Sequence, residues 1–175
     1  MRMLPDYARL AWWGWVSPRV SEPQGLVVVQ GVVVSERGIL LALRRELQGW
    51  ELPGGVGQRG ESEEEALRRE ILEETGIEAR VESLSGEYVR TGFRPHRARV
   101  YRCRAPGDEP RPSDETPRVA WFAKEALPDT LFPWFRGPLE DALRTGPPVS
   151  RHEHQGLGAI LAGVRIDLRT RWQGA

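Results

Sequence analysis

The sequence contains a single cysteine, Cys103, among its 175 residues. One cysteine excludes a disulfide within the chain and is typical of a reducing compartment, so the cytoplasm is the expected location. We interpret Cys103 as a small apolar strand residue rather than as a nucleophile. No apolar run approaches the roughly 20 residues that a membrane-spanning helix needs. The first 20 residues contain no apolar stretch followed by a small-residue cleavage site, so neither a membrane protein nor a signal peptide is expected.

Net charge of either sign is also lacking, because 25 basic residues balance 25 acidic ones. Without a global field to steer it, the chain is not expected to bind long nucleic acid or an anionic membrane. Lys124 is the only lysine. The remaining basic residues are arginines, which suit bidentate contacts to phosphate, although a compositional bias of the genome explains the skew equally well.

The acidic residues are concentrated in one short segment. Residues 61–74 hold seven glutamates against two arginines, a local excess of five negative charges. The glutamates are Glu61, Glu63, Glu64, Glu65, Glu70, Glu73 and Glu74. Such a run usually forms a solvated helix face, so only the spacing of these residues can indicate a site.

The pattern of apolar and turn-forming residues predicts an α/β fold with a mixed sheet. Residues 138–144 favour a short helix, and the polar, proline-rich residues 105–117 favour a loop. Strands are predicted at residues 26–34, 39–43, 77–84, 86–91, 97–104 and 118–122, from their β-branched content and the turns beside them. A further short strand begins at Trp50 and ends where Pro53 removes a ladder donor, and the glycines from Gly54 to Gly60 then form a loop.

The length and the 39% hydrophobic content favour a single domain over residues 1–175, with its core at about residues 25–145. The N-terminal extension, residues 1–24, contains clustered tryptophans that are expected to pack. The C-terminal tail, residues 146–175, has no clear place in the pattern. Its stretch 156–168 is apolar enough to dock, either on this domain or on a second subunit.

The central helix contains the candidate catalytic residues. Ser62 and Glu65 form a capping box that begins it, and Gly76 fits the position just after its end at about Thr75.

Three glutamates of this helix, Glu70, Glu73 and Glu74, stand at i, i+3 and i+4 and therefore share one face. Like charges this close destabilise a helix by about 0.2–0.5 kcal/mol per pair. A hard divalent cation such as Mg²⁺ would offset that repulsion and bridge phosphate oxygens. A carboxylate of the same set could orient or deprotonate an attacking water. Taken alone, the three glutamates also fit a solvent-facing helix with Glu/Arg pairs.

The residues around them decide between these interpretations. The segment Gly55 to Ile77 matches G-x5-E-x7-R-E-U-x-E-E-x-G-U at every defined position, where U is a bulky aliphatic residue. This is the Nudix box, and the sequence strongly resembles the MutT/Nudix family. The strand from Trp50 to Gly55 and the strand Val119 to Phe122 extend the resemblance over about residues 25–145.

The resemblance implies a Nudix-type α/β/α sandwich in which the box forms a loop-helix-loop motif. It implies a hydrolase that cleaves a phosphoanhydride bond in a small nucleotide-like substrate by attack of water on phosphorus. The resemblance implies Mg²⁺ as the metal, with Mn²⁺ as a substitute. Dimers are common in the family, so the resemblance is also compatible with a homodimer. The residues implied to hold the metal are Glu70, Glu73, Glu74 and the Gly54 carbonyl. Arg69 would orient these carboxylates, and Glu61 would support the helix.

Several positions at the edge of the site stay open. Gln58 stands where many members have a glutamate. Glu115 resembles a further carboxylate that some members place in the loop before the tryptophan strand, and its rivals in that loop are Asp108, Glu109 and Asp114. Arg44 and Arg45 follow a strand that should border the cleft, so they are candidates for binding substrate phosphate or are simply surface arginines.

Two other functions fit the same fold. A non-catalytic Nudix module could sense a nucleotide without cleaving it, although such modules often lose box glutamates that this chain keeps. A diphosphate isomerase would need catalytic residues outside the box, and Cys103 alone does not supply them. Nucleoside triphosphates, ADP-ribose, nucleotide sugars, dinucleoside polyphosphates and capped RNA ends are all open as substrates.

Overall fold

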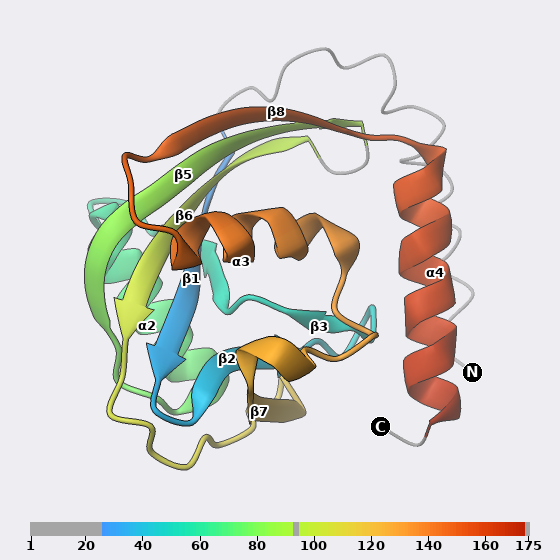
Figure 1. The fold of residues 1–175 in the computed structure, drawn as a ribbon, viewed down its shortest axis with the longest axis horizontal. Helices are drawn as coiled ribbons and strands as arrows, with labels where there is room; N and C mark the ends of the chain where they lie inside the picture. Colours follow the sequence, from blue (N-terminus) through green and yellow to red (C-terminus); the bar gives the residue numbers. More distant parts are fainter. Residues whose placement is uncertain (1–25, 93–94, 174–175) are drawn as a thin grey trace.

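The computed structural model of the protein describes residues 26–92 and 95–173. Its strands are β1 (Val27–Ser35), β2 (Gly38–Leu43), β3 (Trp50–Glu51), β4 (Gly54–Val56), β5 (Arg80–Gly92), β6 (His96–Arg104), β7 (Arg118–Phe122) and β8 (Val149–Gln155). Its helices are α2 (Glu63–Thr75), α3 (Arg136–Leu143) and α4 (Leu157–Trp172), with short 3₁₀ turns η2 (Lys124–Ala126) and η3 (Pro133–Phe135) (Figure 1).

The strands form one mixed sheet, as the sequence predicts. Its order is β3-β2-β1-β6-β5-β8, with β4 also paired to β1 and β7 to β2. β1 runs parallel to β6, from the pair Val27 and Arg97 to the pair Val34 and Arg104, whereas β5 is antiparallel to β6. The long strands β8, β5, β6 and β1 curve together around α3 (Figure 1).

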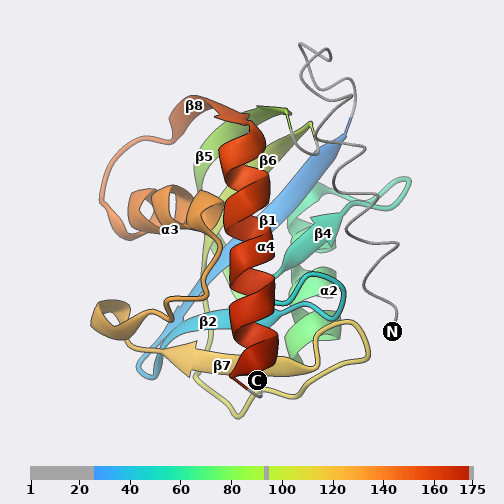
Figure 2. The same cartoon turned by 90° about the vertical axis from the view of Figure 1, so that its right-hand side faces the viewer.

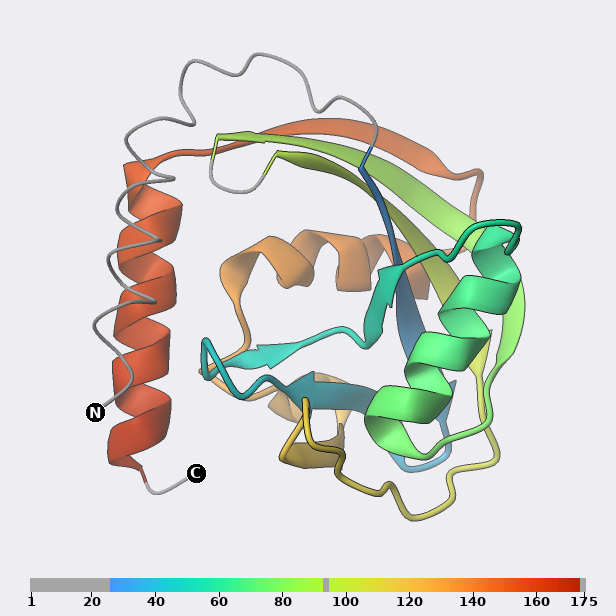
Figure 3. The same cartoon turned by 180° about the vertical axis from the view of Figure 1, so that it is seen from behind.

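Helices cover both faces of this sheet and give it the α/β/α layering of the predicted sandwich. α2 lies on the outer face, as Figure 3 shows, and buries Ala66, Leu67 and Ile71 against Val29 and Val33 of β1. α3 lies on the inner face, where its buried side chains join a second core. That core contains Val32, Leu41, Leu43, Trp50, Leu52, Tyr88, Val100, Phe132, Phe135, Leu139 and Ala142.

The ends of α2 are formed as predicted. The Ser62 side chain accepts from the Glu65 backbone N–H, and the Glu65 carboxylate accepts from the Ser62 N–H at 2.9 Å. Gly76 adopts a left-handed conformation with φ of 68° and donates its N–H to the Leu72 carbonyl at 2.8 Å. These caps satisfy backbone groups that a helix leaves without partners at its ends.

Two strand predictions need correction. The segments 77–84 and 86–91 belong to one strand, β5, because β-bulges between Val81 and Ser83 and between Leu84 and Gly86 absorb the irregular pattern. The strand predicted from Trp50 ends before Pro53 as β3, but the glycine loop predicted from Gly54 onward begins with a further short strand, β4. β3 pairs with β2, whereas β4 pairs with β1.

The C-terminal tail is ordered into β8 and α4, neither of which the sequence pattern assigned. β8 extends the sheet beyond β5 in parallel, and its Glu153 accepts from the fully buried Arg90 at 3.1 Å. β8 has few apolar residues because it is an edge strand among these eight, so its sequence carries little strand signal.

The apolar stretch 156–168 forms most of α4, which stands beside the curved sheet (Figure 2). Its leucines do not drive this contact, since Leu157 and Leu161 are each 70% exposed. Asp167 of α4 accepts from the Gln48 N–H at 2.6 Å, and Arg171 donates to the Glu46 carbonyl at 2.9 Å. Gly163 packs beside Trp134. α4 thereby holds the loop between β2 and β3.

Some expectations concern residues outside those described. The N-terminal extension, with its tryptophans, lies outside the described residues. Among residues 26–92 and 95–173, no helix combines the length and the apolar content needed to cross a membrane.

Candidate active site

The glycine loop at β4 brings the end of α2 and the sheet together. The Gly54 N–H donates to Oε2 of Glu74 at 2.9 Å. A Cβ placed on Gly55 would lie 2.5 Å from Cδ of Glu70, so the Glu70 carboxylate rests directly on the Gly55 backbone. The Glu70 carboxylate can lie in this place only because position 55 has no side chain.

Arg69 connects the other acidic residues of the helix. Its Nε and Nη2 donate to the two carboxylate oxygens of Glu61 at 2.8 and 3.0 Å. Its Nη1 donates to Glu70 at 2.9 Å and to Glu73 at 3.1 Å. The hydrogen bonds that Arg69 donates to Glu61 are the main reason that the pKa of Arg69 is raised, and the guanidinium therefore stays charged. The structure thus gathers three of the predicted carboxylates around the predicted arginine.

Glu61 also holds the start of the loop. Its Oε2 accepts from the Gln58 backbone N–H at 2.9 Å, and hydrogen bonds from Arg69 and Gln58 keep the pKa of Glu61 below its usual value. Since the contact uses the backbone of Gln58, glutamine in place of glutamate there leaves this part of the loop intact.

Glu74 differs from its neighbours because it is buried, with only 4% of its surface exposed. Burial, together with the nearby charges of Glu51 and Glu70, raises its pKa to about 8. The Gly54 N–H and Arg44 oppose this shift without cancelling it. A buried carboxyl crowded by two other carboxylates favours any cation that can share their charge.

Arg44 and Arg45 lie at the border of this site in different surroundings. Arg44 Nε forms a close ion pair with Glu51, and its Nη2 lies 3.8 Å from Oε1 of Glu74. Arg45 is largely exposed and lies 3.7 Å from Asp114. Arg44 is therefore beside the carboxylates, while Arg45 reaches outward toward the long loop before β7.

The same loop is tied to the end of α2 through its backbone. The Thr116 hydroxyl donates to the Glu74 carbonyl, and the Glu115 carbonyl accepts from the Arg45 N–H at 3.1 Å. This places Glu115 next to the site with an exposed side chain. Of its rivals, Glu109 pairs with Arg37 in the β1–β2 turn, and Asp114 faces Arg45.

Glu51 was not predicted from the sequence, although it is part of this charge cluster. The signal that could have found it is an acidic residue in a buried strand that leads into the glycine loop. Residues Ala42 and Glu51 are paired in the β2–β3 ladder, and this register puts Arg44 within reach of Glu51. Without the strand register, the sequence offers no reason to join these two residues.

The residues fit a hard divalent cation in donor chemistry. Glu70, Glu73 and Glu74 offer carboxylate oxygens, and Gly55 leaves a cradle filled only by the Glu70 carboxylate. Within the described ranges, no three acidic, histidine or cysteine side chains converge on one point. The carboxylates of Glu70 and Glu73 accept hydrogen bonds from Arg69, whereas the carboxylate of Glu74 accepts from the Gly54 N–H. The three carboxylates therefore do not share one partner in this structure.

Comparison with known proteins decides the family. A family model described as the NUDIX domain matches residues 25–143, which include the glycine loop and α2. The chain belongs to the Nudix family. It is a hydrolase of phosphoanhydride bonds, and Nudix hydrolases generally depend on a divalent metal.

Three similar proteins illustrate the range of this family. A MutT-like protein of Streptomyces ambofaciens is 41% identical over 139 residues, which cover 78% of this chain and 90% of that protein. An ADP-ribose pyrophosphatase of Methanocaldococcus jannaschii is 34% identical over 112 residues, covering 61% and 66%. The crystal structure of a MutT NUDIX hydrolase from Burkholderia pseudomallei has a TM-score of 0.60 and 32% identity, covering 67% of this chain and 98% of that one.

The buried glutamate of this Nudix helix predicts a pH dependence of stability. Because the folded-state pKa of Glu74 is raised from 4.5 to about 8, its stabilising contribution is complete below pH 4.5. That contribution is lost as the pH rises through 8. In the presence of a chelator, the free energy of unfolding should therefore fall between these values, by on the order of a few kcal/mol.

Urea unfolding at a series of pH values measures this effect. The Glu74→Gln variant is the control, because glutamine cannot ionise, and its stability should vary less over the same window. Equal pH dependence in the two proteins would show that Glu74 does not titrate in this way.

Proposed function

We propose that this Nudix hydrolase is a Mg²⁺-dependent pyrophosphohydrolase of a small nucleotide-like substrate, a nucleoside diphosphate linked to another group. Water would attack one phosphorus of the diphosphate. The observation that carries the proposal is that Glu70 and Glu74 lie against the glycine loop, while Arg69 holds Glu70 and Glu73. An ordinary solvated helix face would not bury one of its glutamates against a backbone N–H.

The metal would be held by Glu70, Glu73, Glu74 and the carbonyl of Gly54. When bound, Mg²⁺ supplies positive charge that neutralises the phosphate oxygens as the bond to phosphorus breaks, and Mn²⁺ could substitute for it. Glu115 would add a further carboxylate from the long loop, because its backbone is anchored beside Glu74 through Thr116.

The other residues would position this set and the substrate. Arg69 holds the carboxylates of Glu61, Glu70 and Glu73 by charge-assisted hydrogen bonds, which limits their movement. One carboxylate of the set would orient the attacking water and accept its proton. Arg44 and Arg45 would contact the substrate phosphates from the border of the site.

The family and the sequence support a proposal for the substrate class and the cellular setting. One relative is named an ADP-ribose pyrophosphatase, which supports a nucleoside diphosphate joined to a second group. Because basic and acidic residues are equal in number, we expect no long nucleic acid as substrate. We further propose that the chain forms one domain over residues 1–175, acts in the cytoplasm, where its single cysteine would stay reduced, and forms a homodimer.

A Mg²⁺-dependent screen of nucleotide substrates tests the proposal. The panel should contain nucleoside triphosphates, ADP-ribose, nucleotide sugars and dinucleoside polyphosphates, with products identified by mass spectrometry in ¹⁸O-labelled water. We expect metal-dependent cleavage of a diphosphate linkage, and the position of the label shows which phosphorus is attacked. Binding of a nucleotide without any metal-dependent product across the panel would instead indicate a non-catalytic sensing module.

A further inference from the structure

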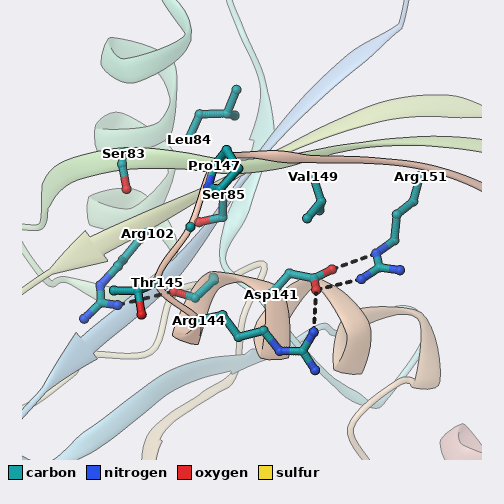
Figure 4. Close-up of a pocket in the computed structure, with 12 residues that line it drawn as sticks. Ser83, Leu84, Ser85, Arg102, Asp141, Arg144, Thr145, Pro147, Val149 and Arg151 are labelled. Carbon is teal, nitrogen blue, oxygen red and sulfur yellow. Dashed lines mark hydrogen bonds and ion pairs between the residues drawn. The ribbon is translucent and has the colours of Figure 1, made fainter.

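A polar cavity lies on the inner face of the sheet, away from the Nudix helix. It has a volume of about 280 Å³ and is bounded by β5, β6, the end of α3 and the loop that leads into β8. Figure 4 shows three arginines around it, Arg102 from β6, Arg144 after α3 and Arg151 from β8. One acidic residue, Asp141, shares the lining with them.

The arginines around the cavity outnumber the carboxylates that hold them. Asp141 accepts from Arg151 at 2.7 and 2.8 Å and lies 3.8 Å from Arg144. Glu82, beside the cavity, pairs with three more arginines: Arg80 at 3.4 Å, Arg102 at 3.2 Å and Arg104 at 2.8 Å. Of these charged residues, only Arg102, Arg144, Arg151 and Asp141 line the cavity, which leaves an excess of two positive charges in the lining. The excess is one if Glu82, the partner of Arg102, is counted with them.

The excess of positive charge persists near neutral pH, because Asp141 and Arg151 both stay ionised there. Hydrogen bonds from Arg151 hold the pKa of Asp141 below its usual value, and hydrogen bonds to Asp141 raise the pKa of Arg151. Arg144 keeps 70% of its side chain exposed and makes its ion pair at 3.8 Å, so most of its N–H donors face solvent. The guanidinium group of Arg144 therefore has N–H donors that make no close hydrogen bond to Asp141.

The cavity is separate from the proposed active site. Its lining contains no residue of α2 or of the glycine loop. Half of its lining lies beyond residue 143, where the match to the NUDIX family model ends. These residues are Arg144, Thr145, Gly146, Pro147, Val149 and Arg151. The cavity is therefore built in large part by a segment outside the matched family domain.

We propose that this cavity binds a small phosphate-bearing anion, of the size of inorganic phosphate or pyrophosphate. Guanidinium groups match phosphate oxygens in charge and in their paired N–H geometry. The hydroxyls of Ser85 and Thr145 lie in the lining and add neutral donors. The volume is at the lower end of ligand pockets, which favours phosphate or pyrophosphate over a whole nucleotide.

Titration calorimetry with inorganic pyrophosphate and, separately, with inorganic phosphate tests this site. The full chain is used with a chelator present, so that no metal holds the anion at the Nudix helix. We expect the wild type to bind one of the two anions. The Arg144→Gln/Arg151→Gln double variant should bind it about tenfold more weakly or worse, because charge-assisted hydrogen bonds are lost.

Arg169→Gln is the matched control. Arg169 is 51% exposed and pairs with Asp129 at 3.1 Å, which is close to the 48% exposure and aspartate partner of Arg151. This variant should bind like the wild type. If the double variant unfolds, Arg144→Gln alone decides, since the one ion pair of this exposed side chain within the described part of the chain is the 3.8 Å contact with Asp141. Circular dichroism establishes the folded state of each variant.

Three outcomes would overturn the proposal. The first is that the wild type binds neither anion. The second is that binding is unchanged in the folded Arg144→Gln/Arg151→Gln or Arg144→Gln protein. The third is that Arg44→Gln abolishes binding while the cavity variants do not, which would assign the anion to the Nudix site. Retained hydrolysis in the cavity variants would show, in addition, that the two sites act separately.

Discussion

Replacing Glu74 with glutamine is expected to lower kcat by about 100- to 10,000-fold while leaving the fold intact. The reason for the loss is that glutamine cannot ionise, so it neither shares charge with a divalent cation nor accepts a proton. The reason for the intact fold is that its side-chain oxygen can still accept the Gly54 N–H, which Glu74 accepts at 2.9 Å. Removal of a buried carboxylate also removes the unfavourable charge that raises the pKa of Glu74.

Steady-state kinetics with the best substrate of the panel, together with thermal unfolding, measures both parts of this expectation. Glu64→Gln is the matched control, since Glu64 is an exposed glutamate of the same helix at a position that the box pattern leaves undefined. It should retain nearly full activity. Full activity in folded Glu74→Gln would remove Glu74 from the proposed catalytic set, and a large loss in Glu64→Gln would mean that total helix charge is what matters.

Replacing Gly54 with alanine is expected to destabilise the protein by about 3 kcal/mol or more. Gly54 has φ of 149°, a conformation that alanine rarely adopts. Its Cβ would also lie 2.1 Å from the Val29 carbonyl oxygen of β1, which is backbone that cannot rotate away. The strand pair between β4 and β1 must then open, and the N–H that holds Glu74 moves with it. Activity should fall together with stability.

Substitutions at two other glycines of the same loop separate the effect of the clash with Val29 from the effect of the backbone conformation. Gly57→Ala should change stability by no more than about 0.5 kcal/mol, because its Cβ would make only an ordinary contact with Ala66 at 3.5 Å. Gly60→Ala should cost about 1–2 kcal/mol, since φ there is 87° although the space is open. Urea unfolding of the three variants measures the series. Equal losses at positions 54 and 57 would contradict the role assigned to the contact with Val29.

Local patterns predicted much of the fold correctly. The β-branched run of β1 and its hairpin partner β2, the capping box at Ser62 and the glycine cap at Gly76 each depend on near neighbours in the chain. Such features are readable because the hydrogen bonds that make them span only a few residues. The spacing of Glu61, Arg69 and the three later glutamates is local for the same reason, and it predicted which residues the structure gathers.

Long-range pairing explains what was not predicted. β8 has a polar sequence and becomes a strand because it pairs with β5. In that pairing Arg90 donates to Glu153, which is 63 residues later in the sequence. Glu51 reaches the active site through the register of β3 on β2. The three arginines of the polar cavity likewise come from separate segments, Arg102 from β6, Arg144 from the end of α3 and Arg151 from β8.

The sequence by itself determined the chemistry of the Nudix helix, namely which side chains are acidic, how far apart they stand and which face they share. Only the tertiary structure decided how different those glutamates are. Glu73 stays exposed and paired with Arg69, whereas Glu74 is buried beside Glu51 and Gly54 with a raised pKa. The physical reason is that helix periodicity places side chains on a face, but burial depends on what the sheet packs against that face.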